Sequence, residues 1–258
     1  MVKKFFAFYI VFCIFFSNVA FAEKKETHRE YYNDIQEDDL KSIEEVLNKY
    51  QIIKNKKDYK RDIKKEEFIE SVLKVIGLND DMVEFYWRYG THCYDIFFDV
   101  GGLDLDKKIF NPAYLRISGE FGIVKGDRIS KTTVNLYPDK KITIDECLEI
   151  MNRCLNKNVS DDVIYQAKEN GLIKDTDKVL SRVHRTLTYE DLCVLLYRFS
   201  VKQICYYFDI SHSPRYIKIF HFPSDKKMNY LELLESRNSD KRFKWLKREL
   251  IKMREREQ

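Results

Sequence analysis

Residues that interrupt regular structure are scarce in this sequence, which has four prolines and eight glycines among 258 residues. Because proline and glycine are the strongest breakers of helices and strands, their scarcity excludes a chain dominated by turns. An excess of one charge is also missing, since 46 lysines and arginines face 42 aspartates and glutamates. This near-neutral balance does not favour bulk binding to nucleic acid. Lysine is abundant, and we expect a mainly helical fold.

The sequence also lacks the common hydrolase motifs. It contains neither G-x-S-x-G nor H-E-x-x-H, the patterns of α/β-hydrolases and zinc proteases. Asp209, His212 and His221 lie close enough in sequence to form a catalytic dyad, although loop histidines beside serine and proline are common without such a role. His92 and Cys93 are adjacent, which does not fit the paired spacing of a zinc site. We therefore expect a protein that is not an enzyme and needs no cofactor.

Calcium-binding motifs are incomplete as well. An EF-hand loop that ended at Glu146 would place Lys140 where the sharp turn requires glycine. The acidic stretch DVGGLDLD, residues 99–106, has three carboxylates beside two glycines. A calcium loop and an acidic surface turn are both open interpretations of that stretch, and the surface turn is the favoured one. We expect no metal site.

The N-terminal stretch MVKKFFAFYIVFCIFFSNVAFA, residues 1–22, has two lysines, an apolar run at 5–16 and the small-residue pattern A-F-A at 20–22. The run is too short to span a bilayer comfortably, and the small residues suit a cleavage site. We interpret residues 1–22 as a signal peptide, with an uncleaved membrane anchor as the alternative. Residues 23–35 are polar, and we expect them to be flexible. The mature chain would be secreted and have no stable membrane span.

Five of the six cysteines follow the predicted signal peptide. An odd number cannot all pair within one exported chain, and none of them shows C-x-x-C spacing. Cys147 and Cys154 are seven residues apart, which places them on one face of a helix, where cysteine behaves as a small hydrophobe. The sequence therefore predicts buried thiols rather than a disulfide framework at Cys93, Cys147, Cys154, Cys193 and Cys205.

A short pattern recurs three times between residues 36 and 200. YQIIKNK, FGIVKGD and NGLIKDT each carry two aliphatic residues followed by lysine, and each follows a candidate helix. Gly122 and Gly171 stand where the C-terminus of a helix favours a left-handed residue, and Gln51 takes that place in the first copy. The lysines of the three copies are Lys54, Lys125 and Lys174.

A second helix start follows each of these turns. When the copies are aligned on Glu67, Glu146 and Asp191, apolar residues occur one, five and eight positions later and a cation occurs seven positions later. This spacing places the apolar residues on one helix face, and the cation suits the helix dipole. Thr143 and Thr188, three residues before their acids, predict capping boxes. Because one hairpin cannot bury its apolar stripe alone, we expect packed repeats at about 36–78, 110–156 and 160–200.

Together these motifs resemble the S-layer homology (SLH) family. The matching stretches are FFDVGG (97–102) for its aromatic-x-Asp-Val motif, FGIVKGD (121–127) for its G-I-V-x-G turn, and ITIDE (142–146), LTYED (187–191) and IKKEE (63–67) for parts of its T-R-A-E signature. The resemblance covers residues 36–200. It implies a mainly α fold of three helix–loop–helix repeats in a pseudo-threefold bundle.

The resemblance also implies a ligand. Domains of this family bind secondary cell-wall polysaccharide, often pyruvylated, in the grooves between repeats, and the signature arginine commonly supplies the cation for the acidic sugar. In this sequence Lys65 keeps a cation at that position, whereas Ile144 and Tyr189 replace it. Lysine offers a point charge but no planar fork for a carboxylate. The expected ligand contacts are Lys65, Lys125 and Lys174, with Lys141 and Arg185 as neighbouring alternatives.

We therefore expect an exported bacterial surface protein that attaches non-covalently to cell-wall polysaccharide. The alternative is a secreted protein-interaction module that keeps the SLH-like fold but has lost sugar binding. Residues 201–258 would form an extension with a basic helix at 241–257. Its apolar residues, Phe243, Leu246, Leu250 and Met253, would either dock on the domain or leave the helix free to touch anionic wall polymer or lipid headgroups.

Overall fold

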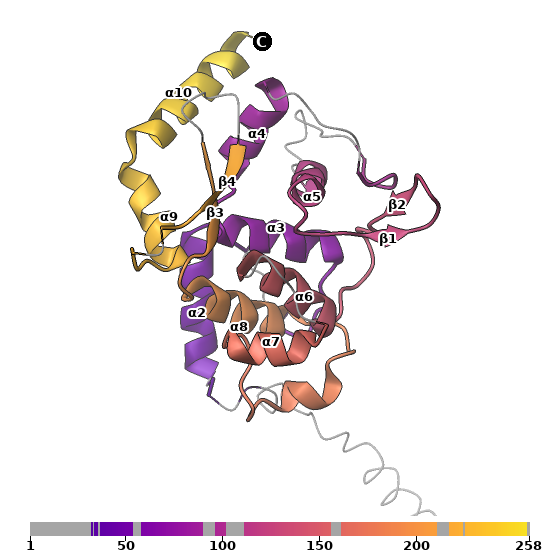
Figure 1. Ribbon diagram of the computed structural model, residues 1–258. Helices are drawn as coiled ribbons and strands as arrows, with labels where there is room; N and C mark the ends of the chain where they lie inside the picture. Colours follow the sequence, from indigo (N-terminus) through magenta and orange to yellow (C-terminus); the bar gives the residue numbers. More distant parts are fainter. Residues whose placement is uncertain are drawn as a thin grey trace, which may run out of the picture.

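The structure is a computed structural model that describes residues 32, 34–35, 37–53, 58–89, 96–101, 111–155, 161–210, 217–223 and 225–256 (Figure 1). The described residues are mainly helical, as the composition predicted, and contain two small two-stranded sheets. The predicted signal peptide at 1–22 lies outside them, as do Lys54, His92, Cys93 and His212. No helix among the described residues is long and apolar enough to cross a membrane.

Three helix–loop–helix units, called hairpins below, occupy the three regions in which the sequence pattern recurs. The first hairpin consists of α2 (Glu37–Lys49) and α3 (Lys65–Val75), the second of α5 (Asn111–Glu120) and α6 (Ile144–Leu155), and the third of α7 (Val163–Glu169) and α8 (Tyr189–Ser200). The second helix of each hairpin packs against the first helix of the next: α3 on α5, α6 on α7, and α8 on α2. The packing therefore closes into a cycle.

Each hairpin turns in the same way after its first helix. The residue at the turn has a left-handed backbone in all three copies, with φ of 57° at Gln51, 68° at Gly122 and 63° at Gly171. The next amide donates to the carbonyl five residues earlier, at 2.9 Å in each case: Ile52 to Leu47, Ile123 to Ser118, and Leu172 to Ala167. This is the Schellman pattern, and it confirms the predicted left-handed positions.

The chain segments that precede the three second helices form a ring of backbone hydrogen bonds with one another. The amide of Ile63 donates to the carbonyl of Leu187 at 2.9 Å, that of Leu187 to Ile142 at 2.8 Å, and that of Ile142 to Ile63 at 3.0 Å. All three side chains are fully buried. We call these three residues the central ring. It joins three segments that are far apart in the sequence, so each hairpin holds the other two in place.

A second set of hydrogen bonds fixes where each second helix begins. The first helical amides of Lys65, Ile144 and Tyr189 donate to carbonyls of the neighbouring hairpin, at Lys140, Arg185 and Arg61, over 2.8, 3.2 and 2.9 Å. These amides have no partner within their own helices, because the first four N–H groups of an α-helix are unsatisfied. The neighbouring hairpin supplies the missing acceptors, which makes the three helix starts interdependent.

The remaining elements lie around this bundle. They are α4 (Asp80–Tyr89), β1 (Asp127–Arg128), β2 (Val134–Asn135), the 3-10 helix η2 (Lys178–Arg182), β3 (Tyr206–Ile210), β4 (Ile217–His221), α9 (Tyr230–Ser239) and α10 (Lys241–Arg256). The antiparallel β3–β4 hairpin is joined to the end of α3 by a hydrogen bond from the Phe208 amide to the Ile76 carbonyl, at 2.9 Å. The extension after residue 200 is therefore attached to the first hairpin.

The basic helix α10 docks on the molecule through its apolar face. Phe243, Leu246 and Leu250 are buried, and Met253 packs against the same core. Figure 1 shows α10 running along the side that carries α4, and the two helices are in contact. Of the two arrangements considered for this helix, the structure has the docked one, in which Arg254 pairs with Glu84 of α4 and Arg242 with Asp209 of β3.

The segment 23–35, expected to be flexible, differs from that expectation where the structure describes it. Tyr32 is only 2% exposed, and its hydroxyl donates to Asp191 at 3.0 Å. Asp34 is 2.6 Å from both Arg198 and Lys174. Burial alone would raise the pKa of Asp34, but the hydrogen bonds from these two cations outweigh it and lower the pKa below its usual value. Asp34 therefore supplies a counter-charge to two cations of the third hairpin.

The described cysteines match the prediction of unpaired thiols. Cys147, Cys154 and Cys193 are free and buried, and Cys205 is free and half-buried. Burial raises the pKa of Cys154 to about 12, because the thiolate would lose its hydration. These thiols are protonated and unreactive at neutral pH, as expected of small hydrophobic residues in a core.

Candidate functional site

At the start of the second helix, an arginine pairs with the signature acid in two of the three hairpins. In the first hairpin the Arg61 guanidinium donates to both carboxylate oxygens of Glu67, at 2.9 and 2.7 Å. In the third, Arg185 makes the same two-pronged contact with Asp191, at 2.7 Å for each bond. The cation precedes the acid by six residues in both. Such paired charge-assisted hydrogen bonds are strong and fix the direction of the acid.

The second hairpin arranges its acid differently. Lys140 stands six residues before Glu146, but its ammonium lies 3.7 Å from the centre of the Tyr137 ring. Glu146 instead accepts from the ammonium of Lys65, which belongs to the first hairpin, at 3.0 Å. Lys65 therefore pairs with an acid of the neighbouring hairpin.

The predicted caps account for the rest of the signature. Thr188 and Asp191 form a complete capping box. Glu146 accepts from the amide of Thr143 at 3.0 Å, so the acid reaches back to the helix start there too. Since the carboxylates are held by helix caps and cations of the fold, the signature residues have structural partners without any ligand.

The signature positions themselves are buried. Lys65 is 9% exposed, and Ile144 and Tyr189 are fully buried. The hydroxyl of Tyr189 donates to Glu44 at 3.0 Å. A ligand at these positions would have to displace packed side chains, and at Lys65 it would also have to break the pair with Glu146.

The other two expected ligand contacts lie on the surface. Lys125 is exposed and has no ion pair with any described residue. Lys174 is about half-exposed and forms an ion pair with Asp34 at 2.6 Å. The alternatives are both paired: Lys141 with Asp62 at 2.5 Å, and Arg185 with Asp191. Of all these cations, Lys125 is the one that a ligand could reach without breaking an ion pair within the described part of the chain.

Three polar residues adjoin the central ring, one before each of its members. The Asp62 carboxylate accepts from the ammonium of Lys141 and, at 2.9 Å, from the hydroxyl of Thr186. The hydrogen bond from Lys141 lowers the pKa of Asp62 below its usual value. One carboxylate therefore links all three hairpins on the outer side of the ring.

A groove lies along the first hairpin, between its turn and α3. It has a cavity volume of about 290 Å³ and is lined by Ile52 and Ile53 of the turn, Asn111 of α5, and a charged wall from the segment 61–74. Within that wall Glu66 has a raised pKa, because burial disfavours its carboxylate. The size is near the lower end of about 300–1,000 Å³ for small-molecule sites. We call this space the first-hairpin groove.

Lys125 and Lys174 occupy positions equivalent to that of Lys54, which follows the aliphatic wall of the groove in the sequence. This wall is formed by the pair that precedes Lys54 in the sequence, and the corresponding pairs, Ile123–Val124 and Leu172–Ile173, precede Lys125 and Lys174. The recurring turn therefore places Lys125 and Lys174 next to the stretches that correspond to the groove wall. Lys65 is not part of this recurring turn, because it lies at the start of α3.

The catalytic and calcium alternatives can be followed only in part, because His212 of the dyad and Asp104 and Asp106 of the acidic stretch lie outside the described residues. Asp209 is 9% exposed and accepts from the Ile210 amide at 2.7 Å, while the ring of His221 packs on Tyr206. Asp99 accepts from two consecutive amides, at Leu136 and Tyr137, so its carboxylate closes a loop. Within the described part of the chain, no group of three or more metal-ligating side chains comes together.

Sequence reasoning missed the role of Tyr32 and Asp34. The signal was present, because Tyr32-x-Asp34-Ile35 has the same aromatic-x-Asp-aliphatic pattern as Phe97-x-Asp99-Val100. Both aromatic side chains are buried. The similarity of the two motifs was overlooked because residues 32–35 lie in a polar stretch soon after the predicted signal peptide.

Two arginines predicted only to suit a helix dipole have a further role. Arg153 and Arg198, in the last turns of α6 and α8, donate to the turn carbonyls of Ile123 and Leu172, at 3.2 and 3.1 Å. Each ties the second helix to the turn of its own hairpin.

No protein-family model matches this chain, and no curated protein is significantly similar to it.

Proposed function

We propose that the three hairpins form a pseudo-threefold bundle of the SLH type. The closed ring of hydrogen bonds among Ile63, Ile142 and Leu187 carries this proposal. The cyclic packing of helices and the three identical turns agree with it. Removal of one hairpin would open both the ring and the packing cycle. The bundle should therefore unfold as one cooperative unit, which denaturation followed by far-UV circular dichroism and by hydrogen exchange of the Ile63, Ile142 and Leu187 amides would test.

We further propose that the chain is an exported bacterial surface protein that attaches through this bundle to cell-wall polysaccharide. The resemblance of its motifs to SLH domains supports the ligand class. The first-hairpin groove and the exposed cation of Lys125 support the place. In this proposal Lys125 and Lys174 contact acidic sugars at the turns of the second and third hairpins, which correspond to the turn that lines the first-hairpin groove. Lys65 acts indirectly, since its pair with Glu146 holds two hairpins together.

Sedimentation of the mature protein with purified wall sacculi tests this function. The sacculi are used with and without their secondary polymer, and binding should require the polymer. The double variant Lys125→Gln/Lys174→Gln should weaken binding by about tenfold or more, as expected for the loss of charge-assisted contacts. The matched control, Lys131→Gln/Lys226→Gln, removes two exposed cations elsewhere on the surface. Equal recovery in the supernatant with both kinds of sacculi would contradict the proposal.

A protein-interaction module that has lost sugar binding is the second candidate. The burial of Lys65, Ile144 and Tyr189 favours it, because none of the signature positions is open to a sugar. This candidate predicts no recovery with sacculi of either kind, together with a folded bundle. The same sedimentation experiment therefore separates the two functions. Both candidates are non-enzymatic.

A further inference from the structure

A second cavity lies where the extension meets the bundle. It has a volume of about 380 Å³ and is bounded by the end of α2, the loop after α3, and helices α4, α9 and α10. We call it the junction pocket. Its walls bring together residues that are up to about 200 positions apart, from Lys49 to Arg254. This cavity is separate from the first-hairpin groove, and of their lining residues they share Lys74.

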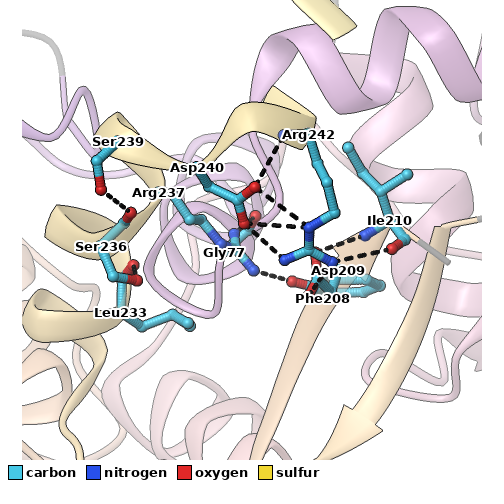
Figure 2. A network of polar contacts seen from close by, with 10 residues as sticks. All are labelled: Gly77, Phe208, Asp209, Ile210, Leu233, Ser236, Arg237, Ser239, Asp240 and Arg242. Atoms are coloured by element: carbon cyan, nitrogen blue, oxygen red, sulfur yellow. Dashed lines mark hydrogen bonds and ion pairs between the residues drawn. The ribbon is translucent and has the colours of Figure 1, made fainter. Parts of the chain in front are cut away.

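The inner wall of the junction pocket carries a buried arginine without a carboxylate partner. Arg237 is 8% exposed, and its guanidinium donates to the backbone carbonyls of Gly77 and Phe208, as Figure 2 shows. Its charge lies over the Phe243 ring, 5.0 Å from the centre. Among the described residues, no aspartate or glutamate lies within ion-pair distance of it. The nearby carboxylates of Asp209 and Asp240 pair with Arg242 instead.

This arrangement leaves donors for another group. An arginine has five N–H donors in a fixed plane, and two of them meet the carbonyls. A buried charge without a counter-ion is unfavourable, and burial lowers the pKa of Arg237 to about 10. The side chain is still charged at neutral pH. An anion in the pocket would supply the missing counter-charge.

Two of the three acidic residues that line the pocket, Glu84 and Asp80, are already engaged. Glu84 forms ion pairs with Arg254 and, at 3.0 Å, with Arg88. Asp80 accepts from the hydroxyl of Tyr114 at 2.8 Å and lies 3.4 Å from Lys74. These acids do not compensate the charge of Arg237.

Helix α10 adds cations at the rim. Lys244 and Lys247 both line the pocket and are exposed. The Lys247 ammonium makes a long contact of 3.9 Å with Asp81, and Lys244 has no ion pair with any described residue. Since they are three residues apart on a helix, both face the same way. The rim therefore has net positive charge next to the buried arginine.

We propose that the junction pocket binds a small molecule that carries an oxyanion, a phosphate or a carboxylate group. The guanidinium of Arg237 would take the oxyanion at the inner wall, since planar paired donors suit such groups. Lys244 and Lys247 would close over it from α10. This inference rests on the pocket alone and holds whether or not the bundle binds wall polymer.

Calorimetric titration of the full mature chain tests the proposal. The probes are inorganic phosphate, pyrophosphate and citrate, which separate phosphate from carboxylate recognition. At least one of them should bind, and the variant Lys244→Ala/Lys247→Ala should weaken that binding by about tenfold or more. The matched control is Arg248→Ala/Lys252→Ala, which removes two exposed cations of the same helix outside the pocket. The control should leave affinity within about twofold.

The role of Arg237 needs a separate variant, because its removal affects the fold. Arg237→Lys keeps the charge but loses the planar fork, and we expect a further loss of affinity with the unfolding transition retained. Absence of binding for all three probes would overturn the proposal. Equal weakening by the two α10 double variants would also overturn it, since it would indicate attraction to the basic helix as a whole.

Discussion

Two buried arginines in this molecule have opposite surroundings. Arg198 in the third hairpin is 7% exposed, and Arg237 at the junction is 8% exposed. Burial works against the charge of both. At Arg198 the carboxylates of Asp177 and Asp34 outweigh burial and raise its pKa, whereas at Arg237 burial prevails and lowers the pKa to about 10. The same residue type therefore serves as one half of a closed ion pair in one region and as a buried cation without an ion-pair partner among the described residues in the other.

The difference separates structural charge from charge that is available to a ligand. In the bundle, Arg61, Arg185 and Arg198 each meet a carboxylate with good geometry. Removal of Arg185 or Arg198 would leave a buried carboxylate, Asp191 or Asp177, without its cation. At the junction, removal of Arg237 would leave two backbone carbonyls without their donors, which is a smaller penalty.

Replacement of each arginine by methionine should show this contrast most clearly. Arg198→Met leaves Asp177, which is 2% exposed, without its cation, and should lower the free energy of unfolding by about 3–5 kcal/mol. Arg237→Met keeps much of the packing volume and should lower it by only about 1–3 kcal/mol. Urea denaturation of the two variants measures both values. Equal losses would mean that the two environments are energetically alike.

An exposed ion pair supplies the control for this comparison. Lys168 and Asp175 are 2.8 Å apart, and the Asp175 side chain is 85% exposed. Asp175→Ala should change the free energy of unfolding by no more than about 0.5 kcal/mol. A large effect there would show that charge removal destabilises this protein through its net charge, and the arginine comparison would then lose its meaning.

Two glycines test whether the junction is packed around Arg237. Gly77 has φ of 95°, and a Cβ there would lie 2.2 Å from the guanidinium of Arg237. Gly122 has φ of 68°, and a Cβ there would meet nothing within 4 Å. Gly122→Ala should therefore cost about 1–2 kcal/mol through backbone strain alone, and Gly77→Ala about 1 kcal/mol more. The thermal midpoints of the two variants give the difference.

The double variant Gly77→Ala/Arg237→Met sharpens this result. Because methionine is flexible and has no fixed donors, it can move away from the added methyl group. The double variant should thus be less destabilised than the sum of the two single ones. Strict additivity would contradict a close approach between these residues.

The sequence predicted the parts of this fold that depend on local spacing. The i, i+4, i+7 apolar positions placed the second helix of each hairpin, and glycine at 122 and 171 indicated the turns that follow two of the first helices. The central ring could not be predicted, because its hydrogen bonds join backbone groups whose side chains are ordinary Ile and Leu. The same limit applies to the junction, where Arg237 meets a carbonyl 160 residues away.

The candidate site was harder to predict than the fold. A lysine at the signature position suggested an open ligand contact, but Lys65 pairs with Glu146 across 81 residues of sequence. The ion-pair partner of Lys65 depends on how the hairpins pack, and a motif within one hairpin does not show which residue of the next hairpin lies beside it. The aromatic-x-Asp pattern at residues 32–35 shows the opposite case, in which a local signal was present in an unpromising stretch.

The pair between Lys65 and Glu146 links two hairpins and should be weaker than the buried pair of Arg198. Glu146 is 41% exposed in its side chain, so water can replace the lost cation. Lys65→Met should therefore lower the free energy of unfolding by no more than about 1 kcal/mol. A double-mutant cycle with Glu146→Gln isolates the interaction, and wall binding should be unchanged in the folded Lys65→Met variant. Loss of wall binding without loss of stability would restore Lys65 as a ligand contact.

A similarly small effect concerns Asp62, whose carboxylate has an ion-pair partner in Lys141, whereas Arg237 has none among the described residues. Because the hydrogen bond from Lys141 lowers its pKa in the folded state, this pair stabilises the protein above the unfolded pKa, and the contribution is lost as the pH falls through the lowered one. Asp62→Asn should thus cost up to about 1 kcal/mol at pH 7 and close to nothing near pH 2. Lys141→Met should show the same convergence, since it removes the other half of the pair. A penalty for Asp62→Asn that stays constant from pH 7 to pH 2 would mean that its hydrogen bond with Thr186, rather than its charge, joins the three hairpins.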